Sequence, residues 1–218
     1  MHTIALIVRS TLFTVPGGDT VQVQQTAAHL NKYLTAEVKL SGDDIDYSRY
    51  DLLHFFNITR PADILYHVKK SGKPYVVSTI LINYSEYDKL HRKGLSGIVF
   101  SMFSHNGIEY LKTVSRWLLG KDKLVSKAYL LKGHKKSVME VLKNARLLLP
   151  NSYSEYRRLQ QLYNCNTPFV VVRNAVDTSL FSFNPREEKE ADLVLCVARI
   201  EGIKNQLNLI RALNHTKF

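Results

Sequence analysis

The chain has 218 residues, of which 45% are hydrophobic and 22% are charged, and its formal net charge is +11. This composition is ordinary for a globular protein, and the apolar runs, such as those at 169–172 and 193–198, are too short to span a bilayer. The N-terminus lacks the pattern of a secretory signal, and Cys165 and Cys196 form no metal-ligand or redox spacing, so we expect a cytoplasmic protein. Such a basic protein seeks anions, which include nucleic acid, anionic lipid and phosphorylated substrates.

Apolar strand-like runs and amphipathic helix-like runs alternate in the first part of the chain. The predicted strands cover residues 3–8, 37–40, 51–56 and 75–78, and the predicted helices cover 20–34 and 61–70. Strands separated by helices pair in parallel through right-handed crossovers, which predicts an α/β fold with a doubly wound, mostly parallel, Rossmann-like sheet. Ligands bind beyond the carboxyl ends of such strands, so the places to look are Gly17 and Gly18 and the loops after Phe56 and Ser78.

The second part of the chain is organised differently. Residues 80–144 are irregular and rich in lysine, and we interpret them as a helical insertion. The alternation then resumes with predicted strands at 145–149, 169–172 and 192–198 and predicted helices at 155–163 and 204–213. These elements predict a first domain over 1–173, an interdomain linker over 174–191 and the first βα unit of a second Rossmann-like domain over 192–218.

The last βα unit carries the most specific motif. Arg199 leaves the end of the predicted strand, and Lys204 follows five residues later at the start of a helix. Strand ends and helix N-termini are where phosphates bind, because free backbone N–H groups and the helix dipole point there. Two cations at that point suit a diphosphate, although in isolation they are more typical of a solvated surface loop.

The segment before this unit gives the motif its context. An apolar strand at 169–172 leads into Asn174-Ala175-Val176-Asp177, then Phe181, the linker, the next apolar strand, Ala198-Arg199 and Lys204. This order resembles that of the retaining glycosyltransferases of family 4, which have the GT-B fold. The resemblance covers nearly the whole chain, loosely over 80–144 and tightly over 169–206.

The resemblance implies roles for individual residues. Arg199 and Lys204 would contact the diphosphate of a nucleotide-sugar and stabilise charge on the leaving nucleotide, without a metal ion or other cofactor. Gly17 and Gly18 would let the backbone approach the donor or the acceptor, because glycine has no Cβ to obstruct it. Asn174 is a further candidate for binding the donor or the acceptor, although with Asp177 it is expected mainly to shape the turn into the linker.

Three departures from the family pattern are visible. Ala175 stands where many members have glycine, and the loop at 79–83 lacks the histidine that many members carry there. The family's E-x7-E element, which holds the donor sugar and the ribose, would lie beyond Phe218. We therefore expect this chain to be a truncated enzyme that has no transferase activity by itself.

Ten cations lie between Tyr110 and Arg146, opposed only by Asp122 and Glu140, and apolar residues are interleaved with them. A helix with a basic and an apolar face can lie on an anionic membrane, which predicts peripheral attachment to the cytoplasmic membrane face. An ordinary solvated basic surface is an equal alternative. The predicted membrane-facing residues are Trp117, Lys121, Lys123 and Lys127.

The resemblance favours an enzyme that transfers a sugar from a nucleotide-sugar to a glycan or a lipid-linked acceptor in the synthesis of a cell-surface polysaccharide. A nucleotide-sugar epimerase with the GT-B fold is one alternative, which the spacing from Arg199 to Lys204 and the N-A-V-D turn make less favourable. A basic non-catalytic module that binds a membrane or nucleic acid is another. We do not expect nucleic acid as a partner, because the sequence contains no nucleic-acid-binding motif or aromatic-basic platform.

Overall fold

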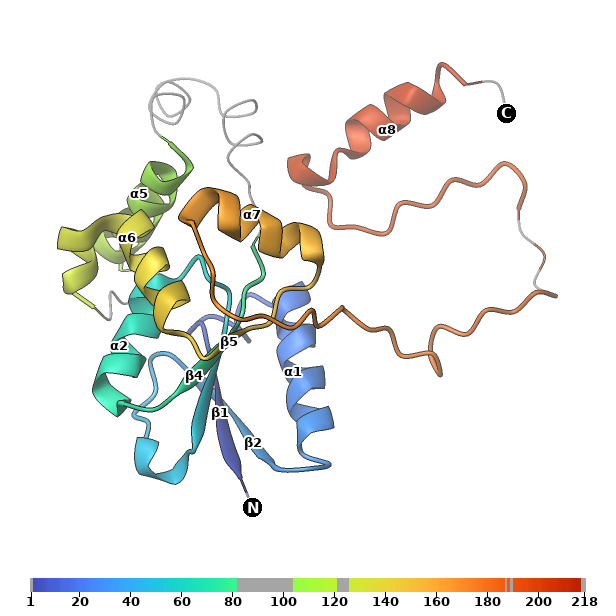
Figure 1. Ribbon diagram of the computed structural model, residues 1–218. Coiled ribbons are helices and arrows are strands. Elements are labelled where there is room, and N and C mark those ends of the chain that lie inside the picture. The colour runs from blue at the N-terminus through green and yellow to red at the C-terminus, as the bar shows by residue number, and fades with distance from the viewer. Residues whose placement is uncertain (1, 82–103, 121–125, 187, 189, 217–218) are drawn as a thin grey trace. The chain divides into compact units, whose positions relative to one another are not determined.

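The computed structural model describes residues 2–81, 104–120, 126–186, 188 and 190–216. The chain divides into two compact units, one made of the described residues up to Asn174 and one that begins at Ala175. The helices and strands of the first unit, drawn from blue to orange in Figure 1, are β1 (Thr3–Val8), α1 (Gly18–Leu30), β2 (Thr35–Leu40), η1 (Tyr47–Arg49), β3 (Leu52–Phe56), α2 (Pro61–Ser71), β4 (Tyr75–Ser78), α5 (His105–Leu118), α6 (Ala128–Asn144), β5 (Leu147–Leu148) and α7 (Tyr153–Tyr163).

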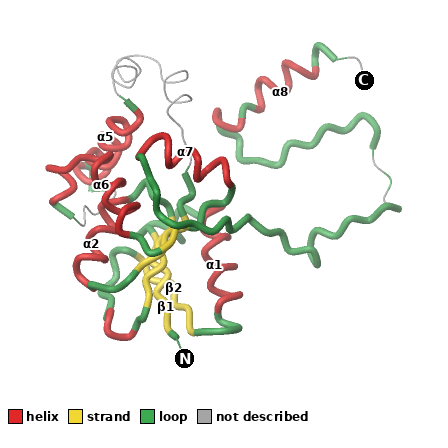
Figure 2. Tube along the Cα trace, viewed as in Figure 1, coloured by secondary structure: helices red, strands yellow, loops and turns green. Residues whose placement is uncertain are grey.

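The five strands form one sheet in the order β2-β1-β3-β4-β5, and every neighbouring pair is parallel. β1 is paired along its whole length with β2 and from Ile4 to Ile7 with β3. The strands lie among the surrounding helices (Figure 2). The prediction of an α/β fold with a parallel, Rossmann-like sheet is confirmed for this unit.

The side chains of β1 alternate between two hydrophobic clusters, as the period of a strand requires. Ala5 and Ile7 lie in a cluster that α2, α6 and α7 complete. Leu6 and Val8 lie in a second cluster, which α1 completes. Since β1 is buried on both faces, its sequence is a continuous apolar run instead of an alternating one.

The helix ends follow the local sequence. Pro61 lies in the first turn of α2, where its missing N–H costs nothing, and Gly72 ends the helix at a φ of 64°, a left-handed conformation that suits glycine. α7 begins at the cap Ser152, whose hydroxyl accepts a hydrogen bond from the backbone N–H of Glu155 at 3.1 Å.

The predicted helical insertion over 80–144 includes a helix that belongs to the core. α6 precedes β5 on the crossover from β4, and its Val138, Val141 and Leu142 are buried in the first cluster. Gly133, at a φ of 74°, kinks α6. Residues 82–103 and 121–125, including the predicted membrane-facing Lys121 and Lys123, lie outside the described residues. Within the described part of the chain, no helix has the length and apolar character to cross a membrane.

Two predicted strands at the end of the first unit are shorter in the structure. The strand expected at 145–149 is reduced to Leu147–Leu148. The segment expected as a strand at 169–172 forms one bridge, between Leu148 and Phe169, although Val170 and Val172 also donate backbone hydrogen bonds to Leu148 and Pro150 at 2.9 Å. Both valines are exposed, so a longer strand there would gain little free energy from apolar burial.

The second unit contains η2 (Gly202–Lys204) and α8 (Gln206–Leu213). The strand predicted at 192–198 is wrong, because those residues form no ladder and their apolar side chains, including Leu195 at 76% and Val197 at 88%, are exposed. A strand is stable only beside partners that take up its N–H and C=O groups, and the described residues of this unit supply none.

A charged cluster occupies β2 at the edge of the sheet. The Glu37 carboxylate accepts hydrogen bonds from the Tyr50 hydroxyl at 2.6 Å and Arg49 Nη2 at 3.0 Å, and it pairs with Lys39 Nζ at 3.0 Å. The hydrogen bond from Tyr50, with smaller contributions from Lys39 and Arg49, lowers the pKa of Glu37. The cluster therefore joins β2 to the turn that precedes β3.

Two buried histidines contribute to the packing of this unit. His54 Nε2 lies 2.9 Å from Ser78 Oγ, and His67 Nδ1 lies 2.7 Å from the Tyr47 hydroxyl. Burial lowers the pKa of each ring to about 4, because a low-polarity surrounding disfavours the charged imidazolium.

These two histidines predict loss of stability in mild acid. The unfolded chain, with ordinary histidine pKa values near 6.5, takes up protons before the folded chain does, so the contribution is complete above pH 6.5 and is lost as the pH falls toward 4. We expect the free energy of unfolding to fall by ~2 kcal/mol per histidine between about pH 7.5 and about pH 5. Urea unfolding at the two pH values measures it. His54→Asn and His67→Asn should each flatten the dependence, and an unchanged slope in the double variant would contradict the assignment.

Candidate functional site

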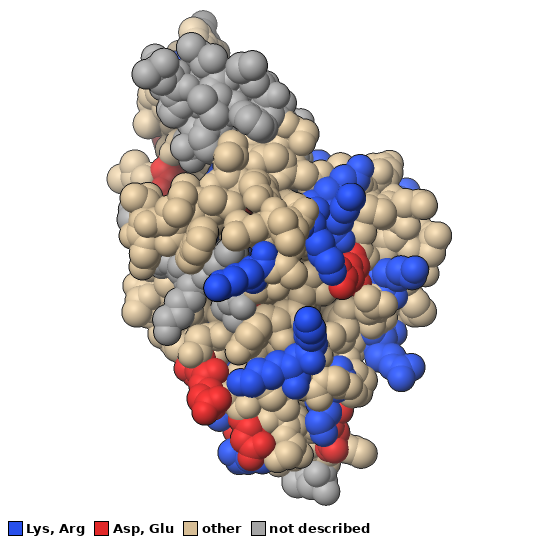
Figure 3. Space-filling view, turned by 90° about the vertical axis from the view of Figure 1, so that its left-hand side faces the viewer, with Lys and Arg blue, Asp and Glu red and all other residues tan. Residues whose placement is uncertain are grey.

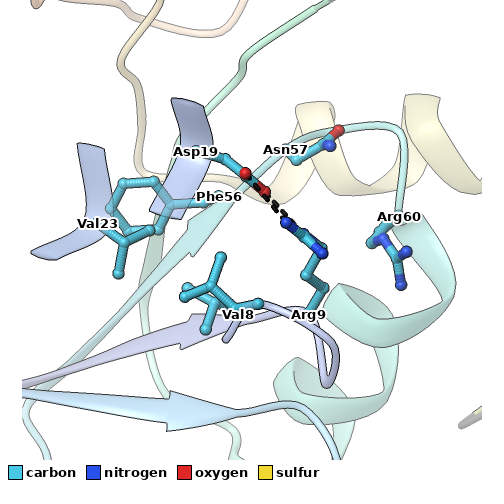
Figure 4. A pocket seen from close by; sticks show the side chains of 8 residues that line it. Val8, Arg9, Asp19, Val23, Phe56, Asn57 and Arg60 are labelled. Atoms are coloured by element: carbon cyan, nitrogen blue, oxygen red, sulfur yellow. Dashed lines mark hydrogen bonds and ion pairs between the residues drawn. The ribbon is translucent and has the colours of Figure 1, made fainter. Parts of the chain in front are cut away.

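The order of the strands creates a topological switch point in the sheet. From β1 the chain crosses through α1 to β2 on one side, and from β3 it crosses through α2 to β4 on the other. The loops that leave β1 and β3 therefore diverge, which is where open α/β sheets bind ligands. A shallow hollow lies at this point, lined by Val8, Arg9, Leu12, Asp19, Val23, Phe56, Asn57 and Arg60 (Figure 4).

Arg9, directly after β1, organises the loop on one side of the hollow. Its Nε and Nη2 donate to the two carboxylate oxygens of Asp19 at 2.7 and 3.1 Å. Nη2 also donates to the Val15 carbonyl at 2.8 Å, and Nη1 donates to the Thr11 carbonyl and hydroxyl, each at 3.0 Å. All five N–H donors of the guanidinium thus have acceptors within the chain. Arg9 therefore shapes the wall of the hollow, and a ligand would reach it only by displacing one of these acceptors.

Asp19 lies in the first turn of α1, where a negative charge also favours the helix dipole. Burial opposes ionisation of this carboxyl, but the hydrogen bonds and charge of Arg9 outweigh it and lower the pKa of Asp19. The Asp19 carboxylate consequently remains ionised at neutral pH.

The structure distinguishes the two predicted glycines. Gly17 is the N-cap of α1, and a Cβ there would lie 3.0 Å from Asp19 Oδ1. Gly18, the next residue, has nothing within 4 Å of where a Cβ would be. A Cβ at residue 17 would therefore press on the Asp19 carboxylate of the Arg9–Asp19 pair, whereas the space beside Gly18 is open.

The opposite wall of the hollow follows β3. Asn57 adopts a left-handed φ of 73°, and its side-chain oxygen accepts hydrogen bonds from the N–H and hydroxyl of Thr59 at 2.9 and 2.6 Å. Arg60, the N-cap of α2, lies 3.9 Å from Asp63 in an ion pair. The sequence indicated this loop but not these two residues. The signal available was the N-x-T turn followed by Arg60-Pro61 at a helix start.

Glu155 ties together two further loops at the same edge of the sheet. Its Oε1 accepts hydrogen bonds from the Thr79 hydroxyl at 2.5 Å and the Leu81 N–H at 2.7 Å, both just after β4. Its Oε2 accepts one from the Asn151 N–H at 2.6 Å, before α7. Asn151 in turn accepts a hydrogen bond from Gln22 of α1 at 3.4 Å. The loops around the carboxyl ends of the strands are thus mutually fixed.

The predicted cations Arg199 and Lys204 lie in the second unit, on either side of Glu201. Arg199 Nε pairs with Glu201 Oε1 at 3.2 Å, and the Lys204 N–H donates to the Glu201 carbonyl at 2.9 Å. The Arg199 carbonyl accepts a hydrogen bond from Gln206 at 2.7 Å, which joins it to the first turn of α8. Both cationic side chains are exposed, so this short segment presents them to solvent together.

The predicted site residues are therefore divided between the units. Gly17 and Gly18 are adjacent in the first, and Arg199 and Lys204 flank Glu201 in the second. Asn174 is exposed at the end of the first unit. Asp177 accepts hydrogen bonds from the N–H and hydroxyl of Ser179 at 2.9 and 2.6 Å, which is the turn-shaping role predicted for it.

Among the described residues, no group of three or more His, Cys, Asp or Glu side chains is arranged to hold a metal ion. No protein-family model matches this chain, and no curated protein matches its sequence significantly. The fold and the local geometry therefore carry the functional argument.

The contact at Gly17 predicts different outcomes for two neighbouring substitutions. Gly17→Ala should displace the Asp19 carboxylate and lower the free energy of unfolding by ~1 kcal/mol, the scale of a strained polar contact. Gly18→Ala should be neutral or stabilising by up to ~1 kcal/mol, since alanine favours a helix over glycine. Urea unfolding of both variants measures this. Equal losses in the two would show that the Arg9–Asp19 pair does not constrain Gly17.

Proposed function

We propose that this chain belongs to a GT-B glycosyltransferase that transfers a sugar, with retention, from a nucleotide-sugar to a glycan or lipid-linked acceptor in the synthesis of a cell-surface polysaccharide. The observation that carries the proposal is the hollow between the ends of β1 and β3, bounded by the turn at Gly17 and Gly18. Its position is the one at which a parallel α/β sheet receives a ligand. It also fits the order of motifs that continues through Asn174 and Asp177 to Arg199 and Lys204.

The first unit would serve as the acceptor-side domain, residues 174–191 as the linker, and 192–218 as the start of the donor-binding domain. The hollow has apolar walls at Val8, Val23 and Phe56 and polar groups at Asn57 and Arg60. Apolar walls with a few polar groups are typical of small-molecule sites. Gly18 would let the chain approach the substrates closely, because the space beside it is open.

Arg199 and Lys204 would hold the donor diphosphate. As the bond from the anomeric carbon to the phosphate breaks, negative charge grows on the leaving nucleotide. Two cations already positioned there stabilise that charge more in the transition state than in the ground state, which accelerates the reaction. For Arg199 to do so, its guanidinium would exchange the exposed partner Glu201 for the phosphate, a small cost at an exposed pair.

The chemistry also fits a cytoplasmic location. Cys165 and Cys196 are both free thiols, and free thiols persist in a reducing compartment.

Binding of a nucleoside diphosphate tests the role of the two cations. We expect saturable binding of at least one of UDP, GDP or ADP in calorimetry, weakened about tenfold or more by Arg199→Ala or Lys204→Ala, because each removes a charge-assisted hydrogen bond. Arg186→Ala is the matched control, since Arg186 is an exposed cation of the same unit, and it should change affinity little. The proposal fails if none of these diphosphates binds saturably, or if neither cation affects binding. Salt-dependent binding to generic DNA in their place would favour the nucleic-acid alternative.

A further inference from the structure

The end of α5 and the first turns of α6 expose large apolar side chains. Trp117, Leu118 and Leu119 end α5 with 38%, 72% and 68% of their surface exposed, and Leu131, in the first turns of α6, is 93% exposed. Single exposed apolar residues are common on soluble proteins, but three consecutive large ones at a helix end are not. These four residues, with the exposed lysines of α6, are called the α5–α6 surface below.

Internal packing fixes the two helices against each other behind this surface. The Tyr110 ring stacks on Tyr129 with centroids 5.6 Å apart, and the Tyr110 hydroxyl donates to the Leu130 carbonyl at 3.0 Å. Ile108 is fully buried on the inner side of α5, and Tyr129 is buried in the first turn of α6. The exposed apolar residues therefore lie on a pair of helices that pack against each other through other side chains.

The neighbouring helix α6 carries exposed cations with little acidic opposition. Lys127, Lys132, Lys135, Lys136 and Lys143 are all exposed. Within residues 104–120 and 126–146, the acidic residues are Glu109 and Glu140, and each forms an ion pair with a lysine, at 3.0 and 2.7 Å. Figure 3 shows this side of the molecule, where lysine and arginine side chains gather and acidic ones lie mostly toward the lower end.

We propose that the α5–α6 surface docks on an anionic lipid bilayer. Trp117, Leu118 and Leu119 enter the boundary between headgroups and acyl chains, where the indole ring is favoured, and the lysines of α6 face the acidic headgroups. Each lysine near an anionic surface adds attraction, and apolar insertion adds the part that a purely basic patch lacks. Nucleic acid would pair with the lysines but leave the consecutive leucines exposed to water. A bilayer accommodates both the lysines and the apolar residues.

This docking does not depend on the proposed transferase activity, because it uses residues outside the hollow and outside the segment from Arg199 to Lys204. Its failure and the failure of nucleotide binding are therefore separate results.

The tryptophan content of the chain makes insertion directly measurable. The sequence contains one tryptophan, so intrinsic tryptophan fluorescence reports on Trp117 alone. With the full chain we expect vesicles of phosphatidylcholine mixed with phosphatidylglycerol to shift the emission to shorter wavelength, and brominated lipids to quench it. Vesicles of phosphatidylcholine alone should give a far smaller shift and far weaker co-sedimentation.

Matched variants separate charge from insertion. Lys135→Gln with Lys136→Gln should weaken vesicle binding about tenfold or more, since two lysines near the surface are lost. Arg157→Gln with Arg158→Gln removes the same charge from the exposed face of α7 and should change binding less than about twofold. Leu118→Ser with Leu119→Ser keeps the reporter and should abolish the emission shift. All six side chains are exposed, so circular dichroism should show an unchanged fold.

Three results would overturn the proposal. The first is equal binding to vesicles with and without phosphatidylglycerol. The second is binding that leaves the Trp117 emission unchanged. The third is binding that the α7 pair reduces as much as the α6 pair. Tight binding of duplex DNA by the lysines of α6, without vesicle binding, would assign the surface to nucleic acid.

Discussion

The pairing of β1 on both of its edges is the constraint on which the first unit depends. With β2 on one side and β3 on the other, β1 sends alternate side chains into the two hydrophobic clusters. The same arrangement makes the loops after β1 and β3 diverge and leaves the hollow between them. The guanidinium of Arg9 then converts the loop after β1 into a fixed wall, because each of its N–H groups has an acceptor. The pairing of β1 with β2 and β3 therefore accounts both for the two hydrophobic clusters and for the hollow.

Much of this unit could be predicted where burial leaves a local signature. The strands Thr3–Val8 and Tyr75–Ser78 match their apolar runs residue for residue, because strands buried on both faces contain few polar positions. The segment at 192–198 has the same signature and forms no strand, since a ladder needs neighbours that no local pattern reveals. Helix starts were shifted by a few residues, as at α1, which begins at Gly18 instead of residue 20.

The candidate site was only partly accessible from the sequence for a related reason. Gly17 and Gly18 are recognisable as a turn before a helix. Arg9, Asn57 and Arg60 become neighbours only through the order of the strands, which brings two distant loops to one edge. Cations illustrate the same limit: the guanidinium of Arg9 is fully engaged by its own loop, whereas several lysines of α6 project into solvent. Arg9 and these lysines contribute equally to the net charge of +11. Only the contacts in the structure show which cations are engaged within the fold and which are available to an anionic surface.

The charged cluster on β2 has a consequence for how copies of this protein meet. β2 is the outermost strand on its side, so its outer backbone groups could template a strand from another molecule. Glu37 and Lys39 lie on that strand, held by Arg49 and Tyr50, and pairing two such edges would strip water from these charged groups. The cluster therefore disfavours edge-to-edge aggregation through β2 at concentrations where an apolar edge of the same length would associate.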